Sequence, residues 1–223
     1  MKAALGNDLI DFRASHNRGR AEQARLLARV LTADERAQLA DERAGDVGFA
    51  LLWSAKEAAY KAAKSIQPAL VFAPGRWQVN RADLALGNCG NSASHSTVVI
   101  ADHLPISVSW QHDAHWLHCI AVLGPVRQPI DSAVLPLADC TPAASFSERE
   151  HDSFSCEQSA AVRVLAKQLL TRRGVADSEI VRKRIGHRLL PPRVFSNGAA
   201  RDDIQLSLSH DGDYVAATIA ISG

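Results

Sequence analysis

W-S-A-K-E-A-A-Y-K-A, residues 53–62, is the stretch of this chain whose pattern decides most about its fold. Its apolar residues recur at helical spacing together with those just upstream, which predicts a helix over residues 47–63. Glu57 and Lys61 lie one turn apart on the same side of this helix. Taken alone, such a pair is most often an exposed ion pair worth about 0.3 to 0.5 kcal/mol. The buried face is predicted to contain Phe49, Leu52, Trp53 and Tyr60.

A second candidate acid lies near the amino terminus, in G-N-D-L-I-D at residues 6–11. Residues 3–12 have the apolar content of a short strand, and Gly6 indicates that another backbone approaches closely. Asp8, on its own, would simply end that strand and cap the next segment of chain. Together with Glu57 and Lys61, however, it completes the set that an enzyme needs to hold a divalent cation against a polyphosphate.

The remaining periodicity predicts an α+β fold without βαβ units. Short helices are expected at residues 21–30 and 34–41, the second with a capping box of Thr32 and Glu35. An amphipathic helix is expected at residues 159–173, closed by Gly174. The predicted strands cover residues 77–80, 97–102, 106–110, 116–123, 179–185, 204–209 and 214–221.

A weak internal repeat suggests two related halves. Residues 106–122 and 206–221 both read as an S-x-S strand, a short polar turn and an aromatic-led apolar strand, the pattern of a hairpin used twice. Any two antiparallel hairpins share these features, so chance similarity is the competing interpretation. If the repeat is real, we expect two similar α+β halves around a pseudo-twofold axis with a cleft between them. The predicted division is residues 1–124, a proline-containing linker at 125–156, and residues 157–223.

Composition excludes several protein classes. The chain has 223 residues, of which 47% are hydrophobic and 22% charged, as expected of a globular protein with a sizeable core. Its amino-terminal residues lack the apolar run of a signal peptide, and nothing later approaches the roughly 18 apolar residues of a membrane span. We therefore expect a cytoplasmic protein with no membrane partner. The four cysteines lack the spacing of a zinc site, and free thiols are expected.

The net charge of +1 hides two basic clusters. Residues 157–201 hold ten Lys or Arg against three acids, and residues 12–31 hold five Arg against one Glu. Such clusters attract anions even in a nearly neutral protein, although arginines on exposed helix faces are the plainer interpretation. A nucleic-acid partner is not expected, because no aromatic-interleaved stripe or known nucleic-acid-binding motif accompanies the charge.

The two motifs together resemble the paired signature of the 4′-phosphopantetheinyl transferases, usually G-I-D followed by W-x-x-K-E-x-x-x-K. R-V-L-T-A-D-E at residues 29–35 and S-L-S-H-D-G at residues 207–212 are similar to two further elements of that family. The resemblance implies Mg²⁺- or Mn²⁺-dependent transfer of phosphopantetheine from coenzyme A to a serine of an apo carrier protein, releasing adenosine 3′,5′-bisphosphate. The order of elements resembles the surfactin-synthetase-activating type with its halves permuted, or alternatively a duplicated holo-acyl-carrier-protein synthase. Two linked halves suggest a monomer.

The resemblance also assigns roles to residues. It implies that Asp8 and Glu57 hold the metal and that Glu57, or a water it orients, takes the serine proton. Lys61 would contact the pyrophosphate, where charge develops in the transition state. The expected contacts to coenzyme A come from Lys56, Lys61, Ser209 and His210, with the 3′-phosphate assigned among Arg163, Arg188 and Arg193. The carrier could be an acyl, polyketide or peptidyl carrier, and we expect residues 13–29 to dock its acidic surface.

Two departures from the family pattern support an alternative. Ile10 stands where the surfactin-type enzymes have a second acid, and that acid is displaced to Asp11. The usual G-K-P element reads Gly186-His187-Arg188. The alternative is a catalytically silent relative that binds carrier protein or coenzyme A. The intact acids and Lys61 favour the enzyme.

Overall fold

The computed structural model describes residues 3–41, 44–80, 95–101, 104–125, 128–140, 146–154, 156–186 and 188–222. Among them the α-helices are α1 (Ala24–Val30), α2 (Ala33–Asp41), α3 (Gly45–Ile66), α4 (Glu148–His151) and α5 (Glu157–Arg172). The fold is a mixed α+β arrangement, as the sequence predicts, and no helix in the described ranges is long and apolar enough to cross a membrane. Cys119, Cys140 and Cys156 are free thiols, as expected, and Cys89 lies outside the described residues.

The first unit is a five-stranded antiparallel sheet covered by a long helix. Its strands, in spatial order, are β1 (Ala4–Asp11), β5 (Trp116–Leu123), β4 (Leu104–His112), β3 (His95–Ala101) and β2 (Gln78–Val79). Helix α3 packs along β1 and β5 and continues one turn beyond the predicted end. Phe49 and Leu52 are fully buried beneath it, with Trp53 and Tyr60 partly buried, which confirms the predicted core face. Thr32 and Glu35 exchange the two hydrogen bonds of the predicted capping box.

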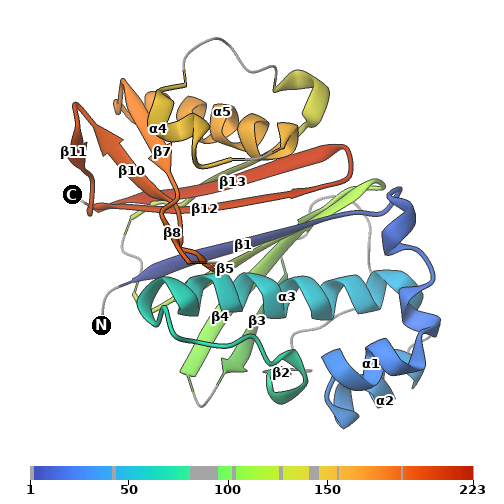
Figure 1. The fold of residues 1–223 in the computed structure, drawn as a ribbon. Helices are drawn as coiled ribbons and strands as arrows, with labels where there is room; N and C mark the ends of the chain where they lie inside the picture. Colours follow the sequence, from blue (N-terminus) through green and yellow to red (C-terminus); the bar gives the residue numbers. More distant parts are fainter. Residues whose placement is uncertain are drawn as a thin grey trace.

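The second unit is built around a three-stranded antiparallel sheet. Its strands, in spatial order, are β12 (Ile204–Asp211), β13 (Tyr214–Ile221) and β6 (Asp131–Pro136). Helix α5 packs on β13 and β12 through a separate apolar core (Figure 1). The smaller strands of this unit are β7 (Ser178–Val181), β10 (Arg193–Ser196) and β11 (Ala199–Ala200) in one sheet, and β8 (Arg184–Ile185) with β9 (Arg188–Leu189) as a short hairpin.

The two units have the same core connectivity. In each, a strand precedes the long helix and a hairpin follows it, and the sheet orders β1-β5-β4 and β6-β13-β12 correspond. Both predicted hairpins are present. The strand β6 falls inside the predicted linker at residues 125–156, which thus supplies part of the second sheet as well as the connection. Counted from the first residue of β5 and of β13, Asp8 in the first unit corresponds to Ala133 in the second.

The two sheets meet where their edge strands β1 and β12 lie against each other (Figure 1). An edge strand exposes backbone groups that need partners, and here side chains provide them. The Asn7 backbone N–H donates to Ser207 Oγ at 2.8 Å, and Ser207 Oγ–H donates to Asn7 Oδ1 at 2.8 Å. Asn7 Nδ2 lies 3.1 Å from His118 Nε2 and donates to the Ala216 carbonyl at 3.2 Å. A buried polar contact therefore joins the units.

Gly6 determines how closely β1 approaches α3. A Cβ built on Gly6 would lie 1.9 Å from the Ala58 carbonyl oxygen and 2.6 Å from the Ala62 nitrogen. Both neighbours are backbone atoms of α3, which cannot rotate away as a side chain can. The close backbone approach predicted for Gly6 is thus confirmed, and it sets the distance between β1 and the helix that holds Glu57 and Lys61.

Substituting Gly6 by alanine should therefore destabilise the protein severely. We expect Gly6→Ala to lower the free energy of unfolding by about 3 kcal/mol or more, the upper range for an overpacked core, as measured by urea denaturation. The control is Gly19→Ala, where φ is +67° and nothing lies within 4 Å of the added Cβ. That variant carries only the backbone cost of a left-handed residue, about 1 to 2 kcal/mol. Equal losses in the two variants would contradict the close-packing argument.

Candidate active site

A pocket of about 610 Å³ opens between the two units. The first unit contributes residues of β1 and α3, and the second contributes residues of α5, β12 and the segment that follows β7. Six of the nine residues predicted for the site line this pocket: Asp8, Glu57, Lys61, Arg163, Ser209 and His210. Residues more than 140 positions apart in the chain thus share one pocket.

Lys61 is held at the centre of the first unit's wall. Its Nζ donates to Asp8 Oδ1 at 2.9 Å and to the Asn7 carbonyl at 2.8 Å, and lies 3.5 Å from Ser209 Oγ. The Lys61 side chain is 32% exposed and that of Asp8 is 12% exposed. An ammonium group so placed faces the pocket while two oxygens of β1 fix its position. It can therefore meet an anionic ligand without reorganising.

Both carboxyl groups of the pocket have raised pKa values. Burial, and after it the Asp8 charge, raise the pKa of Glu57 to about 7 against the lowering effect of the Lys61 charge. Burial also raises the pKa of Asp8, against the lowering effect of Lys61. Each acid is therefore penalised for carrying a negative charge in the pocket. A carboxyl group that titrates near pH 7, as Glu57 does, is suited to proton transfer.

The donor set at Asp8 and Glu57 fits a hard divalent cation. Mg²⁺ takes oxygen ligands and is commonly bound through one or two carboxylates, with substrate phosphates and water completing its shell. Burial raises the pKa of both acids, so their ionisation in the pocket is penalised, and a bound cation would offset that penalty. Within the described ranges, no cluster of three or more His, Cys, Asp or Glu side chains forms a closed metal site. An open site of two carboxylates is what a metal shared with a phosphate ligand requires.

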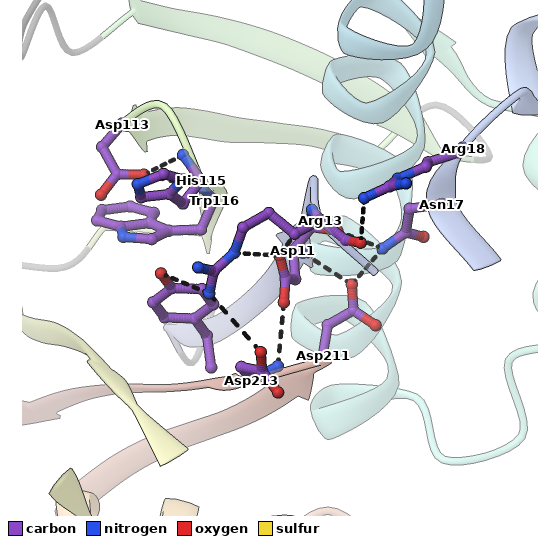
Figure 2. Close-up of polar contacts among 10 residues, drawn as sticks. Asp11, Arg13, Asn17, Arg18, Asp113, His115, Trp116, Asp211 and Asp213 are labelled. Carbon is purple, nitrogen blue, oxygen red and sulfur yellow. Dashed lines mark hydrogen bonds and ion pairs between the residues drawn. The ribbon is translucent and has the colours of Figure 1, made fainter. Parts of the chain in front are cut away.

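Asp11, the displaced second acid, serves a different purpose. Figure 2 shows it at the end of β1, beside the turn between β12 and β13. Its Oδ1 accepts from the Arg13 backbone N–H at 2.8 Å and its Oδ2 from the Asp213 backbone N–H at 3.0 Å. Its own N–H donates to Asp211 Oδ2 at 2.8 Å. Asp11 is 1% exposed and fastens the second hairpin to the first unit, and it does not line the pocket.

Two of the residues predicted to contact coenzyme A are placed elsewhere. Lys56 is fully buried with its Nζ 2.5 Å from Glu35 Oε2, so the prediction that it binds the coenzyme receives no support from its position. Burial lowers the pKa of this amine, and Glu35 opposes that effect. Arg193 is exposed and pairs with Asp202 at 2.5 Å, outside the pocket. The side chain of a third predicted residue, Arg188, lies outside the described part of the chain.

Sequence reasoning missed two basic residues of the pocket, Lys64 and Arg182. Lys64 lies one turn beyond Tyr60 on α3; its Nζ donates to Tyr60 Oη at 2.7 Å and to the Leu70 carbonyl at 3.2 Å. The i,i+3 spacing from Lys61 could have indicated Lys64, because it continues the helix face that carries Glu57 and Lys61. Arg182 belongs to a run of three basic residues, R-K-R, in which no pattern distinguishes one arginine from the next.

Comparison with known proteins finds a family match over the part of the chain that supplies the first unit's side of the pocket. Residues 4–93 match the family model of the 4′-phosphopantetheinyl transferase superfamily. The matched region includes Asp8, Glu57 and Lys61 and ends before the second unit begins. No curated protein matches the chain. The family resemblance of the first unit is thus supported by a finding independent of the pocket geometry.

The pKa of Glu57 predicts how its replacement changes stability with pH. The folded-state pKa of Glu57, about 7, lies above its ordinary value of 4.5, so the folded protein binds this proton more tightly than the unfolded chain does. The unfolding free energy of the wild-type protein should therefore fall as the pH rises from 4.5 through 7. Glu57→Gln cannot ionise. With a chelator present, we expect it to exceed wild type in unfolding free energy at pH 8 by on the order of 2 kcal/mol, and by much less at pH 5.

The matched control is Glu22→Gln, an identical change at an exposed position of the first unit. Its difference from wild type should stay the same at both pH values, as followed by urea denaturation. A Glu57→Gln variant with no more advantage over wild type at pH 8 than at pH 5 would contradict the assigned pKa.

Proposed function

We propose that this protein transfers 4′-phosphopantetheine from coenzyme A to a serine hydroxyl of an apo carrier protein. The observation that carries the proposal is the shared pocket, in which Asp8, Glu57 and Lys61 of the matched region face Ser209 and His210 of the second unit. A general anion-binding protein would need the basic groups but not a pair of carboxylates with raised pKa values. Two carboxylates beside a lysine are suited to bind a divalent cation together with a diphosphate.

Lys61 positions and stabilises the diphosphate in this proposal. As the serine oxygen attacks the phosphorus next to pantetheine, the bond from that phosphorus to the bridging oxygen breaks, and negative charge builds on the leaving phosphate. The Lys61 ammonium is already fixed by Asp8 and the Asn7 carbonyl, so it stabilises this charge without moving. When bound, Mg²⁺ supplies further charge neutralisation, held by Asp8 and Glu57.

Glu57 receives the serine proton, directly or through one water. With a pKa of about 7, roughly half of the Glu57 carboxyl groups are ionised at neutral pH and can accept a proton. The products are the phosphopantetheinylated carrier and adenosine 3′,5′-bisphosphate, and Glu57 releases the proton to solvent before the next cycle. Either Mg²⁺ or Mn²⁺ suits the oxygen donors.

The two units, in this proposal, are the family's two halves in permuted order, related by a pseudo-twofold axis. The matching sheet orders and the helix between strand and hairpin in each unit support a common origin. The duplicated-synthase interpretation shares this expectation, and both place the pocket between the units. A chain that builds the pocket from its own two units has no need of a second copy, so we propose a monomer.

The carrier is proposed to dock on the basic segment that follows β1. Arg18 is exposed and Arg20 half-buried, and both line a smaller groove of about 270 Å³ with Phe12 and Val47. The segment is fixed to the pocket strand because Asn17 Nδ2 donates to Asp211 Oδ2 at 2.5 Å. Basic side chains beside an apolar groove suit an amphipathic helix with an acidic face.

Incubation with coenzyme A, Mg²⁺ and an apo carrier protein should add the phosphopantetheine mass to the carrier, as read by mass spectrometry. Glu57→Gln and Asp8→Asn should lower turnover by about 10²- to 10⁴-fold, and Lys61→Ala should lower kcat by about 10²-fold while raising KM less. Glu22→Gln serves as the matched control and should retain wild-type turnover. No transfer to fatty-acid, polyketide or peptide carriers would instead favour the catalytically silent binding module.

Reversing the charge of the basic segment should separate carrier recognition from coenzyme binding. We expect Arg18→Glu with Arg20→Glu to raise the carrier KM by about tenfold or more, and this effect should shrink at high salt because exposed charges are screened. The affinity for coenzyme A, measured by calorimetry, should stay unchanged. The reverse pattern, a weaker coenzyme affinity with an unaltered carrier KM, would refute the docking assignment.

A further inference from the structure

Arg182 lies on the second unit's wall of the pocket with most of its hydrogen-bonding capacity unused. Its Nε donates to the Leu190 carbonyl at 3.1 Å, which fixes the side chain across the base of the β8–β9 hairpin. Among the described residues this carbonyl is its one hydrogen-bond partner, and none of their carboxylates forms an ion pair with it. A guanidinium has five N–H donors in a planar fork, so four remain for a ligand.

Arg163, the pocket arginine that the sequence suggested for phosphate binding, has all of its hydrogen-bond donors in use. Its Nε donates to the Ile180 carbonyl, its Nη1 to the carbonyl and hydroxyl of Ser159, and its Nη2 to the carbonyl and hydroxyl of Ser153. These five bonds use every donor it has, and the residue is 1% exposed. Arg163 therefore holds the second unit together and has no donor left for a phosphate.

The charges around Arg182 leave this end of the pocket electropositive. Burial lowers the pKa of Arg182. Burial, and after it the Arg182 charge, lower the pKa of Arg163 to about 10, and the charges of Glu150 and Cys156 oppose this shift. The pKa of His210 is lowered first by burial and then by Lys61, with Arg182 and Arg163 adding to the effect. Three cations thus act on one imidazole, and only Asp211 opposes them. A bound anion would relieve this repulsion.

This electropositive end is distinct from the acid pair. The Lys61 charge lowers the pKa of both Asp8 and Glu57, whereas Arg182 is not among the charges that shift either carboxyl group. His210 lines the same pocket, and its pKa is lowered first by burial and then by the charges of Lys61 and Arg182. The pocket therefore presents two cationic side chains on opposite units, Lys61 beside the acids on α3 and Arg182 on the wall of the second unit.

Coenzyme A carries two anionic groups, a diphosphate and a ribose 3′-phosphate. We infer that Arg182 binds the 3′-phosphate and makes the pocket selective for nucleotides that carry it, an inference that rests on the proposed function. The planar fork of its four remaining N–H groups matches the geometry of a phosphate. The bond to Leu190 positions that fork in advance. Arg163 contributes charge to the site without touching the ligand.

Calorimetric binding of two adenosine nucleotides, with Mg²⁺ and without carrier protein, tests the assignment. Wild type should bind adenosine 3′,5′-bisphosphate about 10- to 100-fold more tightly than adenosine 5′-monophosphate, as expected for a charge-assisted contact. Arg182→Gln should lose that preference and leave the affinity for the monophosphate within about twofold of wild type. Arg193→Gln, an identical change at an arginine paired with Asp202 outside the pocket, should keep the full preference.

Arg182→Lys keeps the charge but loses the fork, so it should retain part of the preference. Unchanged affinity for the monophosphate shows that a variant has folded, and thermal unfolding checks this independently. An Arg182→Gln variant with wild-type preference, or an Arg193→Gln variant that loses it, would overturn the assignment. Equal binding of both nucleotides by wild type would overturn it while leaving the proposed transfer intact. Failure of wild type to bind either nucleotide would overturn the coenzyme pocket and this inference together.

Discussion

The buried hydrogen bonds between Asn7 and Ser207 are the constraint on which the rest of the molecule depends. They join two edge strands, and they give the buried backbone N–H of Asn7 a hydrogen-bond partner away from water. Removing one partner would leave the other buried and unpaired, at a cost of about 1 to 3 kcal/mol. Because Asn7 also contacts His118 and the Ala216 carbonyl, the contact fixes both sheets at once. Together with the bonds of Asp11 to the second hairpin, this contact holds the two units on either side of the pocket.

Strand β1 contains both the contact between the units, through Asn7, and a carboxylate of the candidate active site, Asp8. Asp8 follows Asn7 directly, and the Asn7 carbonyl helps to hold the Lys61 ammonium. The burial that makes the strand rigid also raises the pKa of both pocket acids, so the protein accepts a stability cost at neutral pH in exchange for reactive carboxyl groups. The closeness allowed by Gly6 places the helix near enough for Lys61 to reach the strand.

Local pattern was enough to predict much of the fold, whereas features set by tertiary contacts or by a short, proline-flanked strand were not predicted. Alanine and aromatic spacing predicted α3, alternating strands predicted both hairpins, and Gly6 predicted a close backbone contact. The spacing of Lys56 gave no sign that its amine is buried, because its partner Glu35 lies on another helix. Arg163 and Arg182 look alike in sequence, and only the tertiary structure shows that the donors of Arg163 are already hydrogen-bonded within the protein, whereas most of those of Arg182 are not. The strand β6 was missed because D-S-A-V-L-P is short and lies among prolines.

The correspondence of Asp8 with Ala133 has a consequence for binding stoichiometry. Two units of one architecture would be expected to present two equivalent clefts, one built on the first strand of each. The methyl group of Ala133 offers no oxygen to a cation, so the position in the second unit that corresponds to Asp8 cannot hold a metal. In the proposed transferase, each polypeptide therefore binds one equivalent of coenzyme A.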